Sequence, residues 1–177
     1  MKERMQGSGS WLAVLGFGAA VAGAAWFGSR YSPRHPETRV WYDELNKPLF
    51  NPPDAVFPIV WTGLYTLIAV SGWRTWRSQN SRRRTWALCL WAMQLATNAD
   101  WTRRFFGERQ PKRALADVIL LEALILRYIA VTTSVDRGAA ACFVPYAAWV
   151  GFAAVLNSEI VRRNPEPPRP DAQDSIG

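Results

Sequence analysis

The sequence is short of residues that catalyse reactions or bind metal ions. It has one histidine, His35, in a Ser-Pro-Arg-His-Pro segment, and two cysteines, Cys89 and Cys142, each inside an apolar run without a ligand motif. A lone loop histidine is more often solvated than a metal ligand, and buried free thiols say little about the redox compartment. We also find no nucleophile–base pair and no phosphate-binding loop. The sequence therefore predicts no metal site, no required cofactor and no conventional catalytic centre.

Charge is missing from long stretches of the chain. The net charge is +7 and the mean hydropathy is −0.10, because arginines are grouped between apolar runs. A basic protein can bind nucleic acid, but we find no zinc-finger spacing, RNP-like motif or helix-turn-helix pattern. Basic residues beside apolar runs are instead typical of segments that flank a membrane. We expect a membrane protein with no nucleic-acid partner.

Several apolar segments are long enough to cross a bilayer, which requires roughly 20 residues per helix. The five segments are 10–29, 55–73, 85–102, 114–135 and 138–158. We expect an all-α, multi-pass integral membrane domain over residues 10–164, with a flexible tail at 1–9 and a disordered tail at 165–177. Because Lys2 and Arg4 precede it, the first segment also resembles a secretory signal peptide, but it is long for one and lacks a clear cleavage site. A retained helix is favoured.

The connection between the first two segments, residues 30–54, is rich in proline. Pro48, Pro52 and Pro53 lack amide donors and push the residue before each toward extended conformations. We expect a stiff, irregular loop without a continuous helix, held at the mouth of the second helix as a lid. The aromatic pair Trp41 and Tyr42 lies within this loop.

Aromatic and amide side chains recur at helical spacing within three of the segments. These stripes are Trp61 and Tyr65; Trp91, Gln94, Asn98 and Trp101; and Pro145, Trp149, Ala153 and Asn157. Amides in an apolar span are costly unless they are hydrogen-bonded, so they face a cavity or bond only to neighbouring helices. Both alternatives remain open. Pro145 lies inside its helix, where we expect a kink or a freed carbonyl.

The fourth segment is unusually polar, since it contains Asp117, Glu122 and Arg127. An intramembrane glutamate is a functional hypothesis by default. The favoured alternative is that Glu122 pairs with Arg127 or with a residue on a neighbouring helix.

The ordered motifs of the chain resemble those of the TspO/MBR family, the tryptophan-rich sensory proteins and translocator proteins. The resemblance runs from about the first span to Asn164. It rests on Trp41-Tyr-Asp-x-Leu-x-Lys-Pro-x-x-x-Pro-Pro53, Phe57-Pro-x-x-Trp61-Thr-x-Leu-Tyr65, Gln94-Leu-Ala-x-Asn98-x-x-Trp101, Phe105-Phe-Gly107, Pro145-Tyr-x-x-Trp149 and Leu156-Asn157.

The resemblance implies a five-helix bundle, commonly dimeric, in a bacterial membrane or in the mitochondrial outer membrane. Members bind porphyrins such as protoporphyrin IX, sterols and synthetic isoquinolines in a cavity near the first loop. Carried onto this chain, the ligand-binding residues are Trp41, Trp61, Tyr65, Asn98, Trp101, Pro145, Trp149, Ala153 and Leu156. Aromatic faces suit a flat macrocycle, and Asn98 can orient its polar edge.

Other functions remain as alternatives. The family's light-dependent porphyrin degradation would rest on Trp41 and Trp149, and a structural or partner-binding membrane protein would have only an incidental cavity. Ser158 stands where the sterol-recognition segment of the family has a tyrosine after Leu-Asn, which puts sterol binding in doubt. The tryptophans at the helix ends, Trp11, Trp26, Trp73 and Trp76, are expected to fill the bundle or its interfacial belts.

Overall fold

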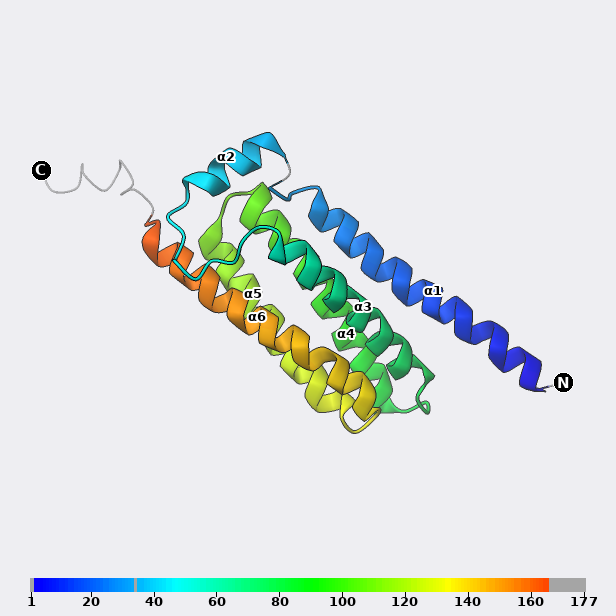
Figure 1. The fold of residues 1–177 in the computed structure, drawn as a ribbon. Helices are drawn as coiled ribbons and strands as arrows, with labels where there is room; N and C mark the ends of the chain where they lie inside the picture. The colour runs from blue at the N-terminus through cyan, green and yellow to red at the C-terminus, as the bar shows by residue number, and fades with distance from the viewer. Residues whose placement is uncertain (1, 34, 166–177) are drawn as a thin grey trace, which may run out of the picture.

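The computed structural model describes residues 2–33 and 35–165, with side chains described at 11–33, 35, 36 and 38–165. Within that part of the chain all regular structure is helical (Figure 1). The elements are α1 (Lys2–Ser29), α2 (Pro36–Glu44), α3 (Val56–Arg77), α4 (Arg82–Thr102), the π-helical turn η1 (Arg103–Gly107), α5 (Pro111–Thr132) and α6 (Arg137–Arg163). The expected all-α fold is confirmed.

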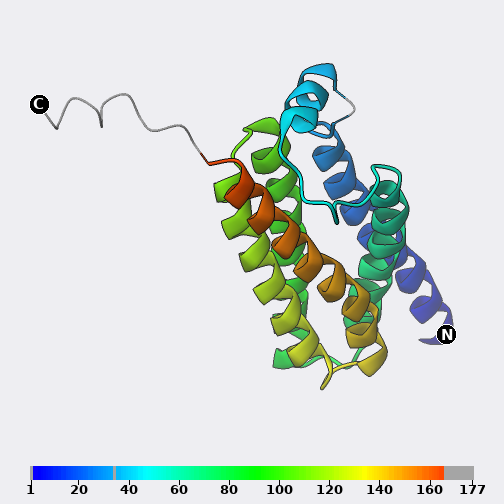
Figure 2. The same cartoon turned by 60° about the vertical axis from the view of Figure 1, so that its left-hand side comes forward.

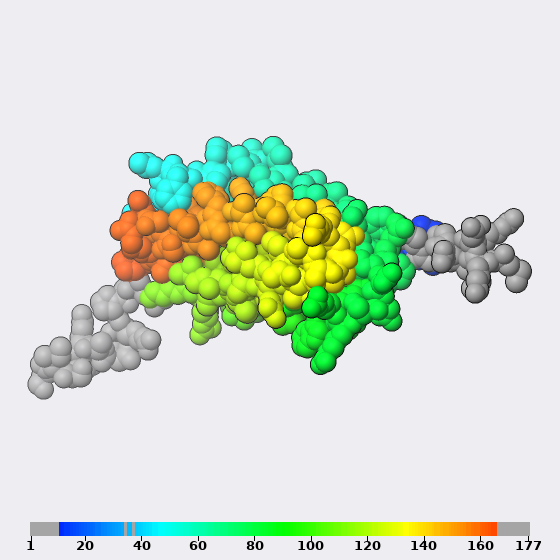
Figure 3. Space-filling model, turned by 90° about the horizontal axis from the view of Figure 1, so that it is seen from below, coloured from blue at the N-terminus to red at the C-terminus, as the bar shows by residue number. Residues whose placement is uncertain are grey.

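Four helices form the body of the bundle, and each runs antiparallel to the next (Figures 1 and 2). α5 packs between α4 and α6, and α3 packs against α6. α1 lies along α3 and α4, while α2 lies across the end of the bundle where α6 finishes. Figure 3 shows α5 and α6 side by side over one face of the molecule.

The connection between α1 and α3 differs from the irregular loop expected over residues 30–54, because it contains the helix α2. Pro36 occupies the first turn of α2, where the missing amide has no intrahelical partner to lose. The next proline is Pro48, beyond the last helical residue, so the prolines limit α2 at its ends without interrupting it. Trp41 and Tyr42 therefore lie on a helix.

The first helix also differs from expectation. α1 begins at Lys2, so the backbone of residues 2–9, expected as a flexible tail, is helical. No proline stands in this stretch, and charged residues at the end of an apolar helix do not terminate it. The other expected tail, 165–177, lies outside the described residues except for Pro165.

Among the described residues, three helices are long and apolar enough to cross a membrane. They are Trp11–Ser29, Val56–Arg77 and Arg137–Arg163. α4 and α5 are of similar length, 21 and 22 residues, but they carry more charge: α4 begins with three arginines, and α5 contains Asp117, Glu122 and Arg127. Each of the five expected segments is helical over most of its length, and three of the helices are apolar enough to cross by this criterion.

The main core lies among α3, α4, α5 and α6, and a smaller cluster lies under α2. Ile68, Ile125 and Phe143 are fully buried in the main core. At the end opposite α2, buried hydroxyls replace apolar packing: the Tyr128 hydroxyl lies 2.8 Å from both Ser71 Oγ and Thr75 Oγ1. These contacts tie α5 to α3 at the end of the bundle opposite α2.

Candidate ligand-binding site

A hydrogen-bonded polar group lies in the middle of the bundle and joins three helices. The Tyr65 hydroxyl on α3 donates to Asn98 Oδ1 on α4 at 3.2 Å. Asn98 Nδ2 in turn donates to the Tyr146 hydroxyl on α6 at 2.9 Å. Asn98 is 4% exposed and Tyr146 is fully buried. The amide is therefore oriented by two tyrosines within an apolar interior, as a specific polar contact for a ligand requires.

Aromatic rings cover this polar group on the α2 side. The Trp61 ring lies 5.2 Å from Tyr65 and 6.1 Å from Tyr146, measured between ring centroids. Trp149, one turn along α6 from Tyr146, lies 5.8 Å from Phe57 and packs on Phe152. Edge-to-face and tilted contacts at these distances stabilise aromatic clusters. The rings form two aromatic groups near Asn98, one of Trp61 with Tyr65 and Tyr146 and one of Trp149 with Phe57 and Phe152.

A second aromatic group joins α2 to the end of α4. Phe105, which is 3% exposed, stacks on Trp101 at a centroid distance of 5.3 Å and meets Trp41 at 5.8 Å. Phe106 contacts Tyr42 at 5.5 Å. The π-helical turn η1 places both phenylalanines against α2, since the wider turn shifts side-chain direction relative to an α-helix. α2 thus rests on aromatic rings supplied by α4 and η1.

The segment after α2 is attached to the end of α6 by a pair of hydrogen bonds. The backbone N–H of Asn46 donates to Asn164 Oδ1 at 2.9 Å, and Asn164 Nδ2 donates to the backbone carbonyl of Asn46 at 3.2 Å. An exposed ion pair of Arg39 with Asp54 holds α2 to the segment that precedes α3, and Arg39 also pairs with Asp43 within α2. The Arg39 hydrogen bond and charge keep the pKa of Asp43 below its usual range.

Some buried polar atoms near the middle of the bundle have no hydrogen-bond partner among the described residues. They include Gln94 Oε1, Trp101 Nε1 and Glu122 Oε2. Gln94 is fully buried, with its amide nitrogen donating to the Trp91 carbonyl. Unpaired buried polar atoms are costly, so they mark places where a bound molecule would improve the local hydrogen bonding.

The structure brings most of the predicted site residues together. Tyr146 contacts Trp61 and is hydrogen-bonded to Asn98, which also binds Tyr65. Phe105 contacts both Trp41 and Trp101. Trp149 contacts Phe57 and Phe152, Ala153 packs on the main core, and Leu156 is buried in the cluster under α2.

Pro145 is not brought to the site, because its side chain is exposed on the outer side of α6. A residue repeated every four positions turns by about 40° per step, since each helical residue advances by about 100°. Pro145 has therefore rotated away from the face that buries Asn157. α6 remains one continuous helix through Pro145.

The favoured Glu122–Arg127 pair is wrong, because no ion pair joins these residues in the described part of the chain. A five-residue separation places two side chains about 140° apart around a helix. Glu122 Oε1 faces Gly151 on α6, at 3.9 Å from the position of a Cβ there, whereas Arg127 faces α4. No partner for Glu122 on a neighbouring helix is found among the described residues either.

The site residues predicted from the sequence do not include Tyr146, Phe57 and Phe105. Each stands inside a motif that was recognised, namely Pro145-Tyr, Phe57-Pro and Phe105-Phe-Gly. Tyr146 directly follows Pro145, and a shift of one residue on a helix turns the side chain by about 100° toward the core. The burial pattern of α6 could have identified it, because Phe143, Tyr146 and Val150 recur at helical spacing.

Comparison with known proteins identifies the family of the chain. The model of the TspO/MBR family matches residues 16–163. The tryptophan-rich sensory protein of Cereibacter sphaeroides is 37% identical over 154 residues, which cover 87% of this chain and 92% of the relative. Protein CrtK of Rhodobacter capsulatus is 34% identical over 86% of this chain and 92% of its own length. The translocator protein of Homo sapiens is 32% identical over 87% of this chain and 91% of its own length. The chain belongs to the TspO/MBR family and is a membrane protein.

Proposed function

We propose that this protein binds porphyrins and related tetrapyrroles between α2 and the helices α3, α4 and α6, and so regulates their transport or signalling. The observation that carries the proposal is the Asn98 amide, oriented by Tyr65 and Tyr146, whose rings both contact Trp61. The names of the relatives, a sensory protein and a translocator protein, are in keeping with ligand recognition in a membrane.

The chemistry of the site suits a flat amphipathic macrocycle. Trp61 and Trp149 offer large apolar faces at little cost in rotamer entropy, and such rings stack on a porphyrin plane. Asn98 and the unpaired Trp101 Nε1 supply polar contacts within the same space. Arg39 at the exposed rim provides a cation for a carboxylate substituent in place of its present partners.

Entry of a ligand requires α2 and the following segment to move, since aromatic rings fill the space beneath them. Residues 45–54 are the proposed lid. Its polar attachments are the Asn46–Asn164 hydrogen bonds and the Arg39–Asp54 ion pair, which lie in solvent. An exposed ion pair contributes roughly 0–1 kcal/mol, so opening chiefly costs the aromatic contacts of Trp41, Tyr42 and Phe50, which the apolar area buried by a macrocycle offsets.

We also propose that all five long helices cross the membrane. α5 packs antiparallel to both α4 and α6, and these are the most extensive helix contacts of the bundle. A helix of about 20 residues spans roughly 30 Å, the thickness of the hydrocarbon core. Asp117, the most buried acid of α5, is neutralised by Arg104 at 3.1 Å near one end of the bundle. This pairing reduces the cost of charge in α5.

A fluorescence titration tests the proposed site. Purified protein in detergent micelles is titrated with protoporphyrin IX while tryptophan emission is recorded. We expect saturable quenching that weakens about tenfold in Trp149→Phe and in Asn98→Ala. The matched control is Trp26→Phe, because Trp26 is 64% exposed on the outer side of α1 and its loss should leave affinity unchanged. Unchanged binding in both site variants would refute the proposed site.

A further inference from the structure

The end of the bundle opposite α2 carries a strong positive charge. α3 ends there, α4 and α6 begin there, and α5 finishes there. The arginines at this end are Arg74, Arg77, Arg82, Arg83, Arg84, Arg127 and Arg137. Among the described side chains, Asp136 is the one acidic residue at this end, and it pairs with Arg74 at 3.0 Å. Within the part of the chain whose side chains are described, none of the other six arginines forms an ion pair with an acidic residue.

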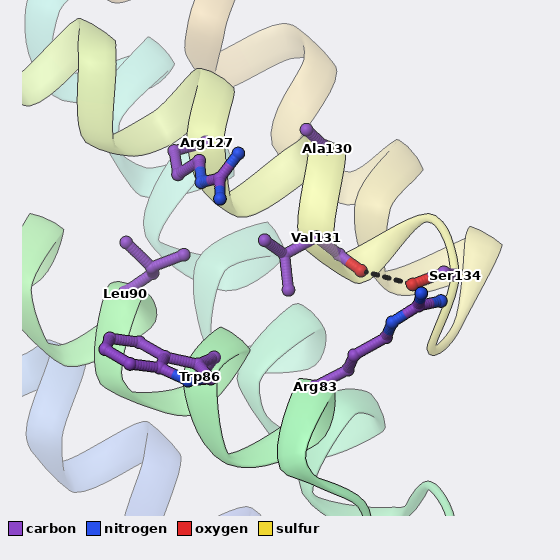
Figure 4. A pocket seen from close by; sticks show the side chains of 7 residues that line it. All are labelled: Arg83, Trp86, Leu90, Arg127, Ala130, Val131 and Ser134. Atoms are coloured by element: carbon purple, nitrogen blue, oxygen red, sulfur yellow. Dashed lines mark hydrogen bonds between the residues drawn. The ribbon is translucent and has the colours of Figure 1, made fainter.

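A hollow of about 560 Å³ opens between α4 and α5 at this end (Figure 4). Arg83, Trp86 and Leu90 line it from α4, and Arg127, Val131 and Ser134 line it from α5 and the turn that follows. Both arginines point into the space between the helices, and the apolar side chains of Leu90 and Val131 lie deeper between them. The lining therefore combines two cationic side chains with apolar side chains.

Neither Arg83 nor Arg127 has a hydrogen bond or ion pair within the described part of the chain. Neighbouring arginines do: Arg74 binds Asp136, and Arg84 donates to the carbonyls of Trp76 and Ser78. Arg127 stands five residues before the end of α5, about 7.5 Å along the axis, so its guanidinium reaches the interfacial region. Unpaired arginines beside apolar residues at that depth require an anion from the surroundings.

We propose that this groove binds the phosphate of an anionic phospholipid between Arg83 and Arg127. The acyl chains would follow the α4–α5 seam past Leu90 and the exposed Met93 and Leu120, which continue the same stripes toward the middle of the bilayer. Trp86, which is 58% exposed, lies beside the headgroup, where indole rings are favoured.

Charge also decides against a second copy of the chain as the occupant of the groove. A two-fold contact through this surface places the same patch on both sides. Arg83 and Arg127 would then meet arginines, because the groove lining contains no acidic residue. An anionic lipid supplies the missing charge and the apolar chains together. The inference rests on α4 and α5 lying in the bilayer, as proposed above, and is independent of porphyrin binding.

Native mass spectrometry of the full chain tests the proposal. The protein, in detergent micelles, is supplied with equal amounts of phosphatidylglycerol and phosphatidylcholine. We expect one phosphatidylglycerol retained in preference to phosphatidylcholine. Arg83→Gln and Arg127→Gln should each weaken retention roughly fivefold, the equivalent of about 1 kcal/mol per basic residue near an anionic surface, and the double variant roughly 25-fold.

Arg82→Gln is the matched control, since it removes the same charge from the same turn of α4 but does not line the groove. Its retention should stay within twofold of the original chain. Equal losses in Arg82→Gln and Arg83→Gln would show diffuse attraction and overturn the site, as would equal retention of the two lipids. Displacement by millimolar inorganic phosphate would show a free-phosphate site and overturn the lipid assignment. The protoporphyrin titration of Arg127→Gln should be unchanged.

Discussion

The hydrogen bond from Asn98 to Tyr146 should make a measurable contribution to the stability of the bundle. The donor–acceptor distance is 2.9 Å, and the two residues are 4% and 0% exposed. Interhelical hydrogen bonds in membranes average about 0.6 kcal/mol and reach about 1.7 kcal/mol. Because this bond is short and fully screened from water, we expect a value near the upper end, about 1–1.5 kcal/mol.

A double-mutant cycle isolates this contribution. Asn98→Leu removes the amide while keeping the volume, and Tyr146→Phe removes the hydroxyl. The free energy of unfolding of both single variants and of the double variant is measured by titrating micellar protein with a denaturing detergent. The coupling energy then gives the interaction free energy between the two side chains, because the separate cost of each substitution cancels in the cycle.

The Tyr65 hydroxyl provides an internal comparison for the cycle. Its bond to Asn98 is longer, 3.2 Å, and Tyr65 is only partly buried. A cycle of Asn98→Leu with Tyr65→Phe should therefore give the smaller coupling, about 0.5 kcal/mol. Zero coupling with Tyr146, or a larger coupling with Tyr65 than with Tyr146, would refute the arrangement of the polar group.

Three further changes test other parts of the structure. Glu122→Leu should raise the free energy of unfolding by about 1–3 kcal/mol, because it removes a buried carboxylate oxygen without a partner; a lower melting temperature would show that the carboxylate has a favourable partner. Asp136→Ala removes the cap of α6 and should cost about 1 kcal/mol at pH 7. Burial raises the pKa of Asp136, but hydrogen bonds and the nearby guanidinium outweigh it and set the pKa below its usual range. Its charge thus stabilises the fold above about pH 4, and unfolding measured at decreasing pH should show the difference between the two proteins shrinking below that value; a constant difference would contradict this. Gly72→Ala would place a Cβ 2.6 Å from the Phe17 ring and should cost about 1–3 kcal/mol, whereas Gly63→Ala on the same helix meets no atom within 4 Å and should be tolerated; equal melting temperatures for the two alanine variants would argue against this packing of α1.

The sequence predicts the helices well because their signal is local. Runs without charge over about 20 residues require helical backbone in a bilayer. The arginines beside these runs mark helix ends: α3 ends at Arg77, α4 begins at Arg82, and α6 begins at Arg137 and ends at Arg163. α2 escaped prediction because its prolines were taken as interruptions. Pro36 is the first of the nine residues of α2 and Pro48 lies beyond the last, so neither interrupts the helix.

The site is predicted less completely, since it depends on contacts between distant residues. Trp61, Tyr65 and Asn98 were identified from spacing and family resemblance, but the bond from Asn98 to Tyr146 joins residues 48 apart in the chain. Spacing also assigns residues to the wrong face when the repeat is four residues long, because each repeat turns about 40° around the helix. Pro145 is exposed for this reason, although its motif marks the correct region of α6.

The central claim, that a tetrapyrrole binds among the tryptophans beneath α2, is tested most directly by photo-oxidation with protoporphyrin IX. Light absorbed by a bound porphyrin generates short-lived oxidants, so the nearest tryptophans react first, and peptide mass spectrometry locates them. At one porphyrin per chain we predict that Trp41, Trp61 and Trp149 are oxidised before Trp11 and Trp26, although the last two are 55% and 64% exposed. Oxidation that follows exposure, with Trp11 and Trp26 reacting first, would contradict the site.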